Sequence, residues 1–480
     1  MKIKFSHFTA HTSIALLNFS KGNAHDDENV SLRGWKNSKV GRSLSVQGSE
    51  VVYTTNSDFD FGSSVNVNHN DIQDQLQLDS SSNPFNFIWV ACSTRGTVIK
   101  VDTLSGTILG EYRSSPRYHP PSTQVLNGNP SRTTMDPNGS VWVANRNAIG
   151  PNNRGTIVHI SLNENNQCED CNGIPGIQTS TGLGDIKNWT NMTGNRGVST
   201  ADDECIVHYT EVNSTGTCHL SIDSNYDVWV SGSGIQTFDK VKGGRWDVQD
   251  SGKILVSYPS VGKGGYGGLI DPNGFLWSSH PDAYAPYDIH LLRWDTSKPL
   301  NGTNGDPLGN SIGPLLPGTN WASQNIDSYG LCIDSQGNVW STTMESDGIV
   351  KFASNGTHGN HEAQGCAVGL NDDVWVAHGK AITTSSPSYT VGHLLNNGTH
   401  LGNVRVGRGP TGVAVDGKGK VWSTNYDNSS LLRIDPSLNN GVGGVDLNVS
   451  LGSGCGPYNY GSMTGRDIPP PQFRIMDCNL

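Results

Sequence analysis

A short motif built around tryptophan recurs along the 480 residues and constrains the fold more than any other feature. Its clearest copy, residues 410–435, holds two runs that alternate apolar and polar residues, separated by Asp-x-x-Gly. Alternation of this kind is typical of β-strands, and Asp with Gly favours a tight turn. The motif therefore predicts a hairpin followed by a further strand. Its copies are marked by Trp89, Trp142, Trp229, Trp277, Trp340, Trp375 and Trp422.

One such unit cannot bury both faces of its small sheet, so successive units must pack radially. The sequence thus predicts an all-β fold, a seven-bladed β-propeller over residues 51–454 with an insertion at about 146–216. Two β-sandwiches are the alternative, but a Trp at a fixed offset from each turn argues against them. Composition agrees: 59 residues are Gly and only 16% are charged, which suits many turns and few helices.

The ends of the chain lack the motif. Residues 1–50 show no periodicity and are expected to be a disordered extension or a secretory signal. Residues 51–80 contain two alternating stretches and form an arm. This arm either completes the last blade and closes the ring or adds to the sheet edge of a neighbouring chain. Residues 455–480 form a C-terminal tail.

Cysteines and glycosylation sequons both point to an extracellular protein. Nine cysteines in a charge-poor chain predict disulfides and an oxidising compartment, with one thiol left over. Cys205–Cys218 within the insertion and Cys455–Cys478 in the tail are the expected pairs. The candidate glycosylation sites are Asn138, Asn188, Asn191, Asn213, Asn301, Asn355, Asn397, Asn428 and Asn448.

Charge and hydropathy exclude two classes of partner. The net charge is −11 and no basic cluster stands out, so a nucleic-acid partner is not expected. The sequence has no run of 18 apolar residues, so no membrane span is expected either.

Residues 410–424 resemble NHL-type repeats and, more closely, the repeats of virginiamycin B (streptogramin) lyases. Other stretches resemble a group of uncharacterised secreted propeller proteins, which implies fold and location only: residues 74–78, 95–102, 129–134, 181–185 and 202–206.

The lyase resemblance implies Mg²⁺ held by Glu residues that shortly follow the Trp, together with a His acid or base. Mg²⁺ prefers carboxylate oxygens. None occurs three residues after the repeat tryptophans, so no cofactor is expected. That position is held by Cys92, Asn145, Gly232, His280, Thr343, His378 and Asn425.

Polar residues near the strand starts are the candidate ligand contacts. Arg132, Tyr266 and Tyr329 fall near the starts of first strands, where propellers point side chains at the centre. His280, His378 and Asn425 are expected at the channel mouth, where two histidines without a third ligand make a poor metal site.

Residues 223–227 resemble the start of a calcium loop. They lack the Gly at its sixth position and the acidic residue at its twelfth, so they are predicted to be a hairpin turn.

Together these features predict a non-enzymatic extracellular glycoprotein that acts as a scaffold and self-assembles into filaments or a surface layer. Its partners are then other copies of the chain, extracellular proteins or glycans. One alternative is a lyase-like or metal-dependent enzyme that works at the central channel through His280 and His378. Another is a carbohydrate- or peptide-binding propeller that uses Tyr266 and Tyr329.

Overall fold

A computed structural model of the chain divides it into two units, residues 1–83 and 84–480. The structure describes residues 67–68, 77–78, 85–117, 127–147, 154–163, 167–190, 197–235, 237–259, 264–271, 274–280, 291–296, 328–343, 349–352, 363–379 and 389–464. In the first unit, β1 (Val67–Asn68) pairs with β2 (Gln77–Leu78) in antiparallel fashion. The rest of the predicted extension and arm lies outside the described residues.

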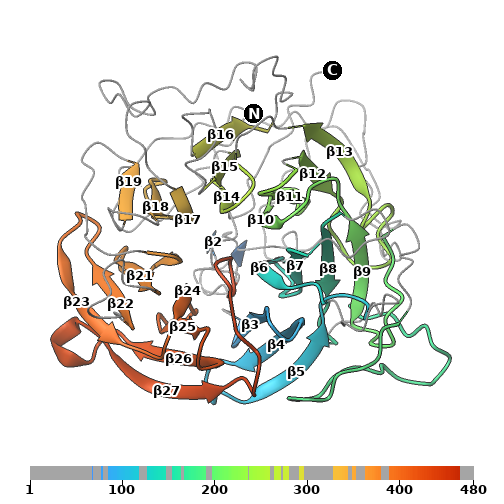
Figure 1. The fold of residues 1–480 in the computed structure, drawn as a ribbon, viewed down its shortest axis with the longest axis horizontal. Coiled ribbons are helices and arrows are strands. Elements are labelled where there is room, and N and C mark those ends of the chain that lie inside the picture. The colour runs from blue at the N-terminus through green and yellow to red at the C-terminus, as the bar shows by residue number, and fades with distance from the viewer. Residues whose placement is uncertain are drawn as a thin grey trace, which may run out of the picture. The chain divides into compact units, whose positions relative to one another are not determined.

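The second unit is a β-propeller, which confirms the predicted all-β class (Figure 1). Six sheets are built from consecutive antiparallel strands, and each starts with an inner strand of its own. The first three are β6 (Pro130–Met135), β7 (Val141–Asn145), β8 (Thr156–Ile160) and β9 (Ile206–Glu211); β10 (Thr217–Ile222), β11 (Val228–Gly232), β12 (Thr237–Val241) and β13 (Ile254–Pro259); and β14 (Gly268–Ile270), β15 (Phe275–Ser279) and β16 (Leu291–Asp295). The next three are β17 (Ser328–Ile333), β18 (Val339–Thr343) and β19 (Ile349–Phe352); β20 (Cys366–Val368), β21 (Val374–His378), β22 (Thr390–Leu394) and β23 (His400–Arg405); and β24 (Pro410–Val415), β25 (Val421–Asn425), β26 (Ser430–Asp435) and β27 (Gly444–Ser450).

The unit around Trp89 differs, so the chain forms six self-contained blades rather than the seven predicted. Its sheet consists of β3 (Phe87–Cys92), β4 (Thr97–Asp102) and β5 (Ile108–Arg113), and it begins at the Trp strand. Residues 455–464, hereafter the closing segment, run along the open edge of β3. Trp89 N–H donates to the Met463 carbonyl at 3.0 Å, and Cys92 forms a β-bridge with Pro457. The C-terminal segment, predicted to be a tail, therefore closes the ring, a role that the sequence analysis gave to residues 51–80 as one of two alternatives.

Four blades share a hydrogen bond between the turn and the buried indole. Asp416 shows the pattern: its Oδ1 accepts the backbone N–H groups of Lys418 and Lys420 at 2.9 Å, and its Oδ2 accepts Trp422 Nε1–H at 2.9 Å. Gly419 completes the turn with φ +77°, a conformation that glycine adopts without strain. The same bond from the indole to the Asp six residues earlier joins Trp229 to Asp223, Trp277 to Asp271 and Trp340 to Asp334.

The turn at Asp223 confirms the hairpin prediction for residues 223–227. Asp223 Oδ1 accepts the N–H groups of Asn225 and Asp227 at 2.8 and 3.1 Å, between β10 and β11. Its Oδ2 holds the Trp229 indole and pairs with Lys240 at 2.8 Å. Both carboxylate oxygens of Asp223 therefore bond to groups of its own blade.

The disulfides differ from the predicted pairs. Cys205 bonds to Cys168 and Cys455 bonds to Cys92, while Cys332 bonds to Cys366. Cys205–Cys218 is wrong because Cys205 immediately precedes the outer strand β9, whereas Cys218 lies on the inner strand β10 of the next sheet. Cys455–Cys478 is wrong because the closing segment places Cys455 against β3; Cys478 lies outside the described residues. Cys171 and Cys218 are free thiols.

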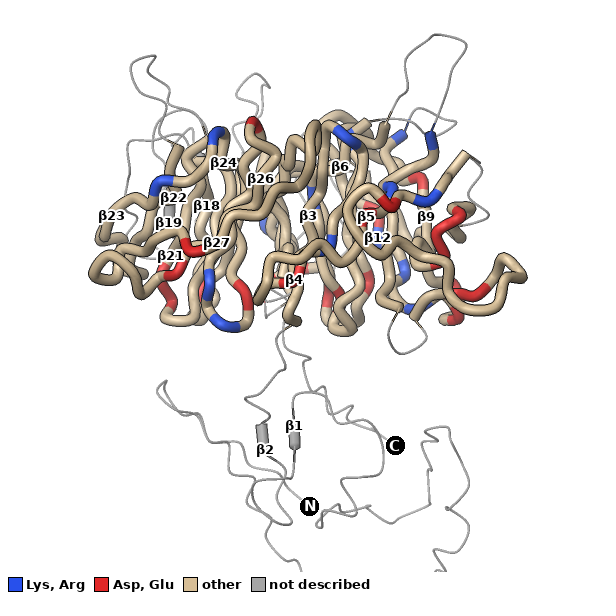
Figure 2. Tube along the Cα trace, turned by 90° about the horizontal axis from the view of Figure 1, so that it is seen from below, with Lys and Arg blue, Asp and Glu red and all other residues tan. Residues whose placement is uncertain are grey.

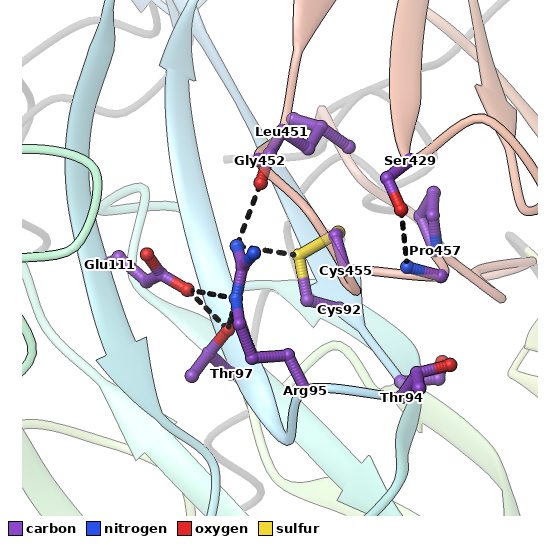
Figure 3. The surroundings of a disulfide bond; sticks show 12 residues. Cys92, Thr94, Arg95, Thr97, Glu111, Ser429, Leu451, Gly452, Cys455 and Pro457 are labelled. Atoms are coloured by element: carbon purple, nitrogen blue, oxygen red, sulfur yellow. Dashed lines mark hydrogen bonds and ion pairs between the residues drawn. A yellow bond between two sulfur atoms is a disulfide. The ribbon is translucent and has the colours of Figure 1, made fainter.

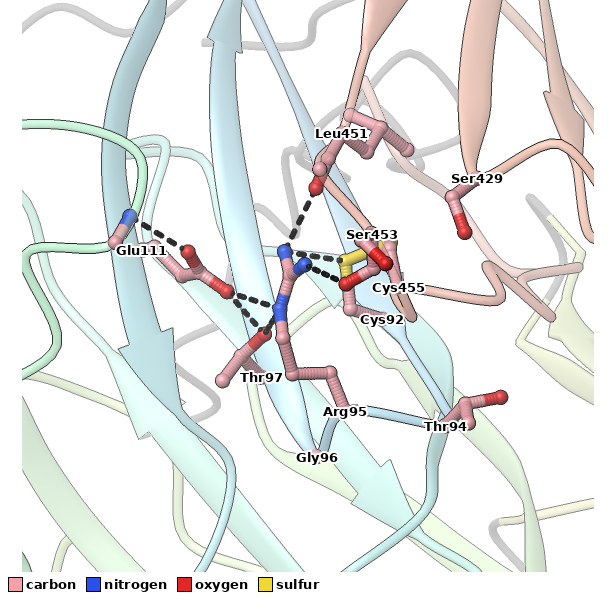
Figure 4. A network of polar contacts seen from close by, with 12 residues as sticks. Cys92, Thr94, Arg95, Gly96, Thr97, Glu111, Ser429, Leu451, Ser453 and Cys455 are labelled. Carbon is pink, nitrogen blue, oxygen red and sulfur yellow. Dashed lines mark hydrogen bonds and ion pairs between the residues drawn. A yellow bond between two sulfur atoms is a disulfide. The ribbon is translucent and has the colours of Figure 1, made fainter.

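A polar network joins the sheet of β3, β4 and β5 to residues 451–453, which lie between β27 and the closing segment (Figures 3 and 4). Arg95 donates from Nε to Glu111 at 2.7 Å, and from Nη2 and Nη1 to the carbonyls of Leu451 and Ser453 at 2.7 and 3.0 Å. Glu111 is 1% exposed and also accepts Gly184 N–H at 2.9 Å. The buried ion pair thus binds β5, the segment after β27 and the insertion together.

Residues 161–205, between β8 and β9, fall within the predicted insertion. Asp203 accepts Thr179 Oγ1–H at 2.8 Å and Ser180 N–H at 3.0 Å, and Cys168–Cys205 joins its two ends. Ser180 Oγ accepts a hydrogen bond from the backbone N–H of Glu111 at 2.8 Å. The insertion therefore covers the outer strand β5 of the neighbouring sheet.

Charged residues make up only 16% of the chain, and residues of both signs are scattered over the ring (Figure 2).

Replacing Asp416 by Ala is expected to lower the free energy of unfolding by about 1–3 kcal/mol, because buried donors lose their acceptor. Urea unfolding followed by tryptophan fluorescence measures the change. Asp427→Ala, at an exposed position in the next turn of the same sheet, is the matched control. Equal losses in the two variants would contradict the role assigned to the bond between turn and indole.

Replacing Cys92 and Cys455 together by Ser is expected to lower the free energy of unfolding by roughly 3–5 kcal/mol, because this bridge restrains a very long loop of the unfolded chain. Denaturant unfolding under non-reducing conditions measures the loss. Cys171→Ser removes an exposed free thiol and should leave stability unchanged. A double variant as stable as this control would show that the closing segment holds without its disulfide.

Candidate binding site at the centre of the ring

Four tyrosines from separate parts of the chain meet through their hydroxyl groups. Tyr329 Oη lies 2.6 Å from Tyr266 Oη and 3.0 Å from Tyr460 Oη, and it also bonds to Tyr458 Oη. A longer contact of 3.3 Å joins Tyr266 Oη and Tyr458 Oη. We call these four residues the tyrosine cluster. It lies at the ring centre because its members come from inner-strand positions of three different sheets.

The backbone around Tyr266 explains how it reaches the others. Tyr266 precedes β14 and is flanked by glycines. A Cβ added at Gly267 would lie 2.2 Å from the Tyr329 carbonyl oxygen, and one at Gly265 would lie 2.3 Å from the Gly232 carbonyl oxygen. Only glycine permits approaches this close, so these residues bring the chain against the inner strand β17 on one side and the end of β11 on the other.

Arg132 of β6 lies beside the cluster and is only 3% exposed. Its Nε donates to the Cys218 carbonyl at 2.8 Å. Its guanidinium lies 4.1 Å from the ring centroid of Tyr460 and 5.2 Å from that of Tyr266. Nη1 and Nη2 are buried and have no hydrogen-bond partner among the residues that the structure describes.

A second arginine approaches from the same sheet. Arg146, which follows β7, lies 4.5 Å from the ring centroid of Tyr458 and donates to Asn129 Oδ1 at 3.2 Å. The site therefore combines aromatic rings, hydroxyl groups and two guanidinium groups.

Burial keeps the other titratable groups of the site neutral. It raises the pKa of Tyr266, Tyr329 and Tyr460 well above the usual value, and it also raises the pKa of the Cys218 thiol. These three phenols and the thiol are therefore uncharged at neutral pH, so the positive charge of the site comes from Arg132 and Arg146.

Three of the predicted ligand contacts, Arg132, Tyr266 and Tyr329, are brought together in this site. The histidines are placed differently: His280 directly follows β15 and His378 ends β21, both are buried, and His378 packs against Gly392 of β22. Among the described residues, no group of three His, Cys, Asp or Glu side chains is arranged to hold a metal ion.

Asn425 is fully buried within its own sheet, and its amide donates to the Ser423 carbonyl at 3.0 Å. It is predicted at the channel mouth, but its amide nitrogen bonds within its own strand, β25. We therefore leave Asn425 out of the candidate site.

Sequence analysis missed Tyr458, Tyr460 and Arg146. Residues 455–480 contain no tryptophan unit, so the sequence predicts a tail there. The signal that was available is the spacing of Tyr458 and Tyr460, which puts both side chains on the same side of an extended segment.

The candidate glycosylation sites divide by exposure. Asn213 donates its amide to Asp239 at 3.0 Å and to Ser257 at 2.9 Å, so it is engaged within the fold. Asn191, Asn301 and Asn355 lie outside the described residues. The exposed sites are Asn138, Asn188, Asn397, Asn428 and Asn448.

Fold and site define this protein as a β-propeller with a central cluster of tyrosines and arginines. No family model matches the chain, and no curated protein matches it. Within the described residues, no helix is long and apolar enough to cross a membrane.

Several solved structures are similar to it. Virginiamycin B lyase from Staphylococcus aureus is 14% identical, with 69% of this chain and 87% of that one covered and a TM-score of 0.41. A functionally unknown protein from Desulfotomaculum acetoxidans is 12% identical, with 79% and 98% covered and a TM-score of 0.47. The periplasmic gluconolactonase of Pseudomonas aeruginosa is 13% identical, with 76% and 96% covered and a TM-score of 0.44. Likeness at this level carries no argument about activity, so function is argued from this chain's own residues.

Two buried histidines make the fold sensitive to acid. His219 on β10 hydrogen-bonds Ser278 Oγ at 2.9 Å, and burial lowers its pKa to about 3. His208 on β9 bonds His159 at 2.9 Å, and burial together with that neighbour lowers its pKa. The unfolded chain therefore binds protons at these positions before the folded chain does, so their stabilisation is present above about pH 6.5 and is lost as the pH falls.

We expect the free energy of unfolding to drop by about 2–3 kcal/mol from His219 alone between pH 6.5 and pH 4.5. Urea unfolding at several pH values measures the slope. His219→Gln should flatten it, whereas His400→Gln, at an exposed position on β23, should not. An unchanged slope in His219→Gln would refute the assignment.

Proposed function

We propose that this protein is an extracytoplasmic carbohydrate-binding propeller whose ligand site is the tyrosine cluster with its arginines. The observation that carries the proposal is the meeting of four phenols from three sheets at the ring centre. A tyrosine offers an apolar ring that packs against the C–H face of a sugar and a hydroxyl that both donates and accepts.

The mutual bonds of the four hydroxyl groups are compatible with this role. Each phenol can exchange a phenol partner for a sugar hydroxyl at little net cost, because one neutral hydrogen bond replaces another. Tyr266 and Tyr458 remain partly exposed, so the cluster has a side that meets solvent.

The three disulfides support the proposed location, since such bonds persist in oxidising compartments. We also propose that glycans are attached at the exposed sequons. Several expectations from the sequence stay predictions. They are the scaffold and filament hypothesis, self-association, the lack of enzymatic activity and the lack of a cofactor. Secretion and the grouping with NHL-type repeats also stay predictions.

Oligosaccharide binding by the full chain, screened on a glycan array and quantified by calorimetry, tests the proposal. Tyr266→Ala and Tyr329→Ala should each weaken binding at least tenfold, about 1.4 kcal/mol, because a ring and a hydroxyl are lost. Tyr266→Phe, which keeps the ring, should lose less.

Trp246→Ala is the control, since Trp246 is an exposed aromatic residue between β12 and β13. Saccharide binding that survives both tyrosine variants, or no binding to any glycan, would refute the proposed site.

A further inference from the structure

Arg132 has an unusual state for a buried cation. It is 3% exposed, and its Nε donates to a carbonyl. Within the described part of the chain, both of its terminal amino groups lack a hydrogen-bond partner. A guanidinium stays charged at any physiological pH, and a buried charge without partners destabilises the fold. Tyr460 and Tyr266 offer their rings to the cation but do not satisfy its N–H groups.

The neighbouring groups do not balance this charge. The groups that bond or stack with Arg132 and Arg146 are phenol rings, the Cys218 carbonyl and the Asn129 amide, and none of these is an anion. The second guanidinium, on Arg146, adds to the positive charge. In a chain of net charge −11, such a concentration of cations at the centre favours an anion from outside.

We propose that Arg132 binds the carboxylate of an acidic saccharide through Nη1 and Nη2. This inference rests on the proposed carbohydrate-binding function and names its ligand class. Two N–H groups at the end of a planar guanidinium match the two coplanar oxygens of a carboxylate. A sulfate ester has the same oxyanion chemistry in tetrahedral geometry, and the experiment separates the two.

Entry to Arg132 runs past the tyrosines. Both terminal nitrogens are closed from solvent, whereas Tyr266 and Tyr458 are half-buried. The bond between their hydroxyls is the longest of the cluster, at 3.3 Å. This bond is therefore the one of the cluster that a ligand would break most easily.

The test compares three probes on the full chain by calorimetry: an oligogalacturonate, its methyl ester, and a sulfated galactan oligomer. The unmodified protein is expected to bind the oligogalacturonate at least tenfold more tightly than the neutral ester or the sulfated oligomer. Arg132→Gln should abolish that preference, and Arg132→Lys, which keeps the charge but not the paired N–H groups, should retain only part of it. Arg245→Gln, in an exposed ion pair with Asp247, is the control and should bind as the unmodified protein does.

The outcomes separate this inference from the function on which it rests. Two outcomes would overturn the role of Arg132 without contradicting the carbohydrate site. One is Tyr266-dependent binding that shows no preference for the carboxylate. The other is a preference for the carboxylate that survives Arg132→Gln. Equal or tighter binding of the sulfated oligomer would overturn the carboxylate assignment. Binding of none of the probes, together with an empty glycan screen, would overturn both.

If Arg132→Gln does not fold, thermal unfolding of the unmodified protein decides. Stabilisation by the oligogalacturonate that clearly exceeds that by its ester supports the inference, and equal stabilisation overturns it.

Discussion

The hydrogen bond from a buried indole to the aspartate of its own turn is the interaction on which the rest of the structure depends. It does two things at once: it fixes the hairpin through backbone N–H groups, and it orients a large ring between neighbouring sheets. A turn and a core residue are thereby specified by the same carboxylate. Because the bond recurs in four blades, their turns and tryptophans are placed alike, and residues near the starts of inner strands meet at the centre.

This dependence explains what could be predicted from the sequence. The Asp, Gly and Trp of a blade lie within a few residues of each other, so local pattern was enough to predict the sheets and to place Arg132, Tyr266 and Tyr329 near the centre. The same rule failed at Asn425, because a position along the strand does not say whether a side chain turns outward or back into its own sheet.

Contacts between residues distant in sequence could not be predicted in this way. Cys92 and Cys455 are 363 residues apart, and nothing in their local sequence marks them as partners. Cys205 and Cys218 are close in sequence yet lie near the outer and inner strands of adjacent sheets. Tyr458 and Tyr460 belong to a segment without any repeat signature, so half of the tyrosine cluster became apparent only from the structure.

The closing segment has a consequence for how the molecule matures. Its residues are among the last of the described chain to leave the ribosome, yet they supply two of the four tyrosines and one cysteine of the bridge to β3. A nascent chain that has reached only β27 can form its separate blades, because each is local, but the ring stays open and the central site incomplete. Docking of this segment must be slow compared with hairpin formation, since it joins parts of the chain that are far apart. The proposed ligand site is therefore complete only once the closing segment has been synthesised and has docked against β3.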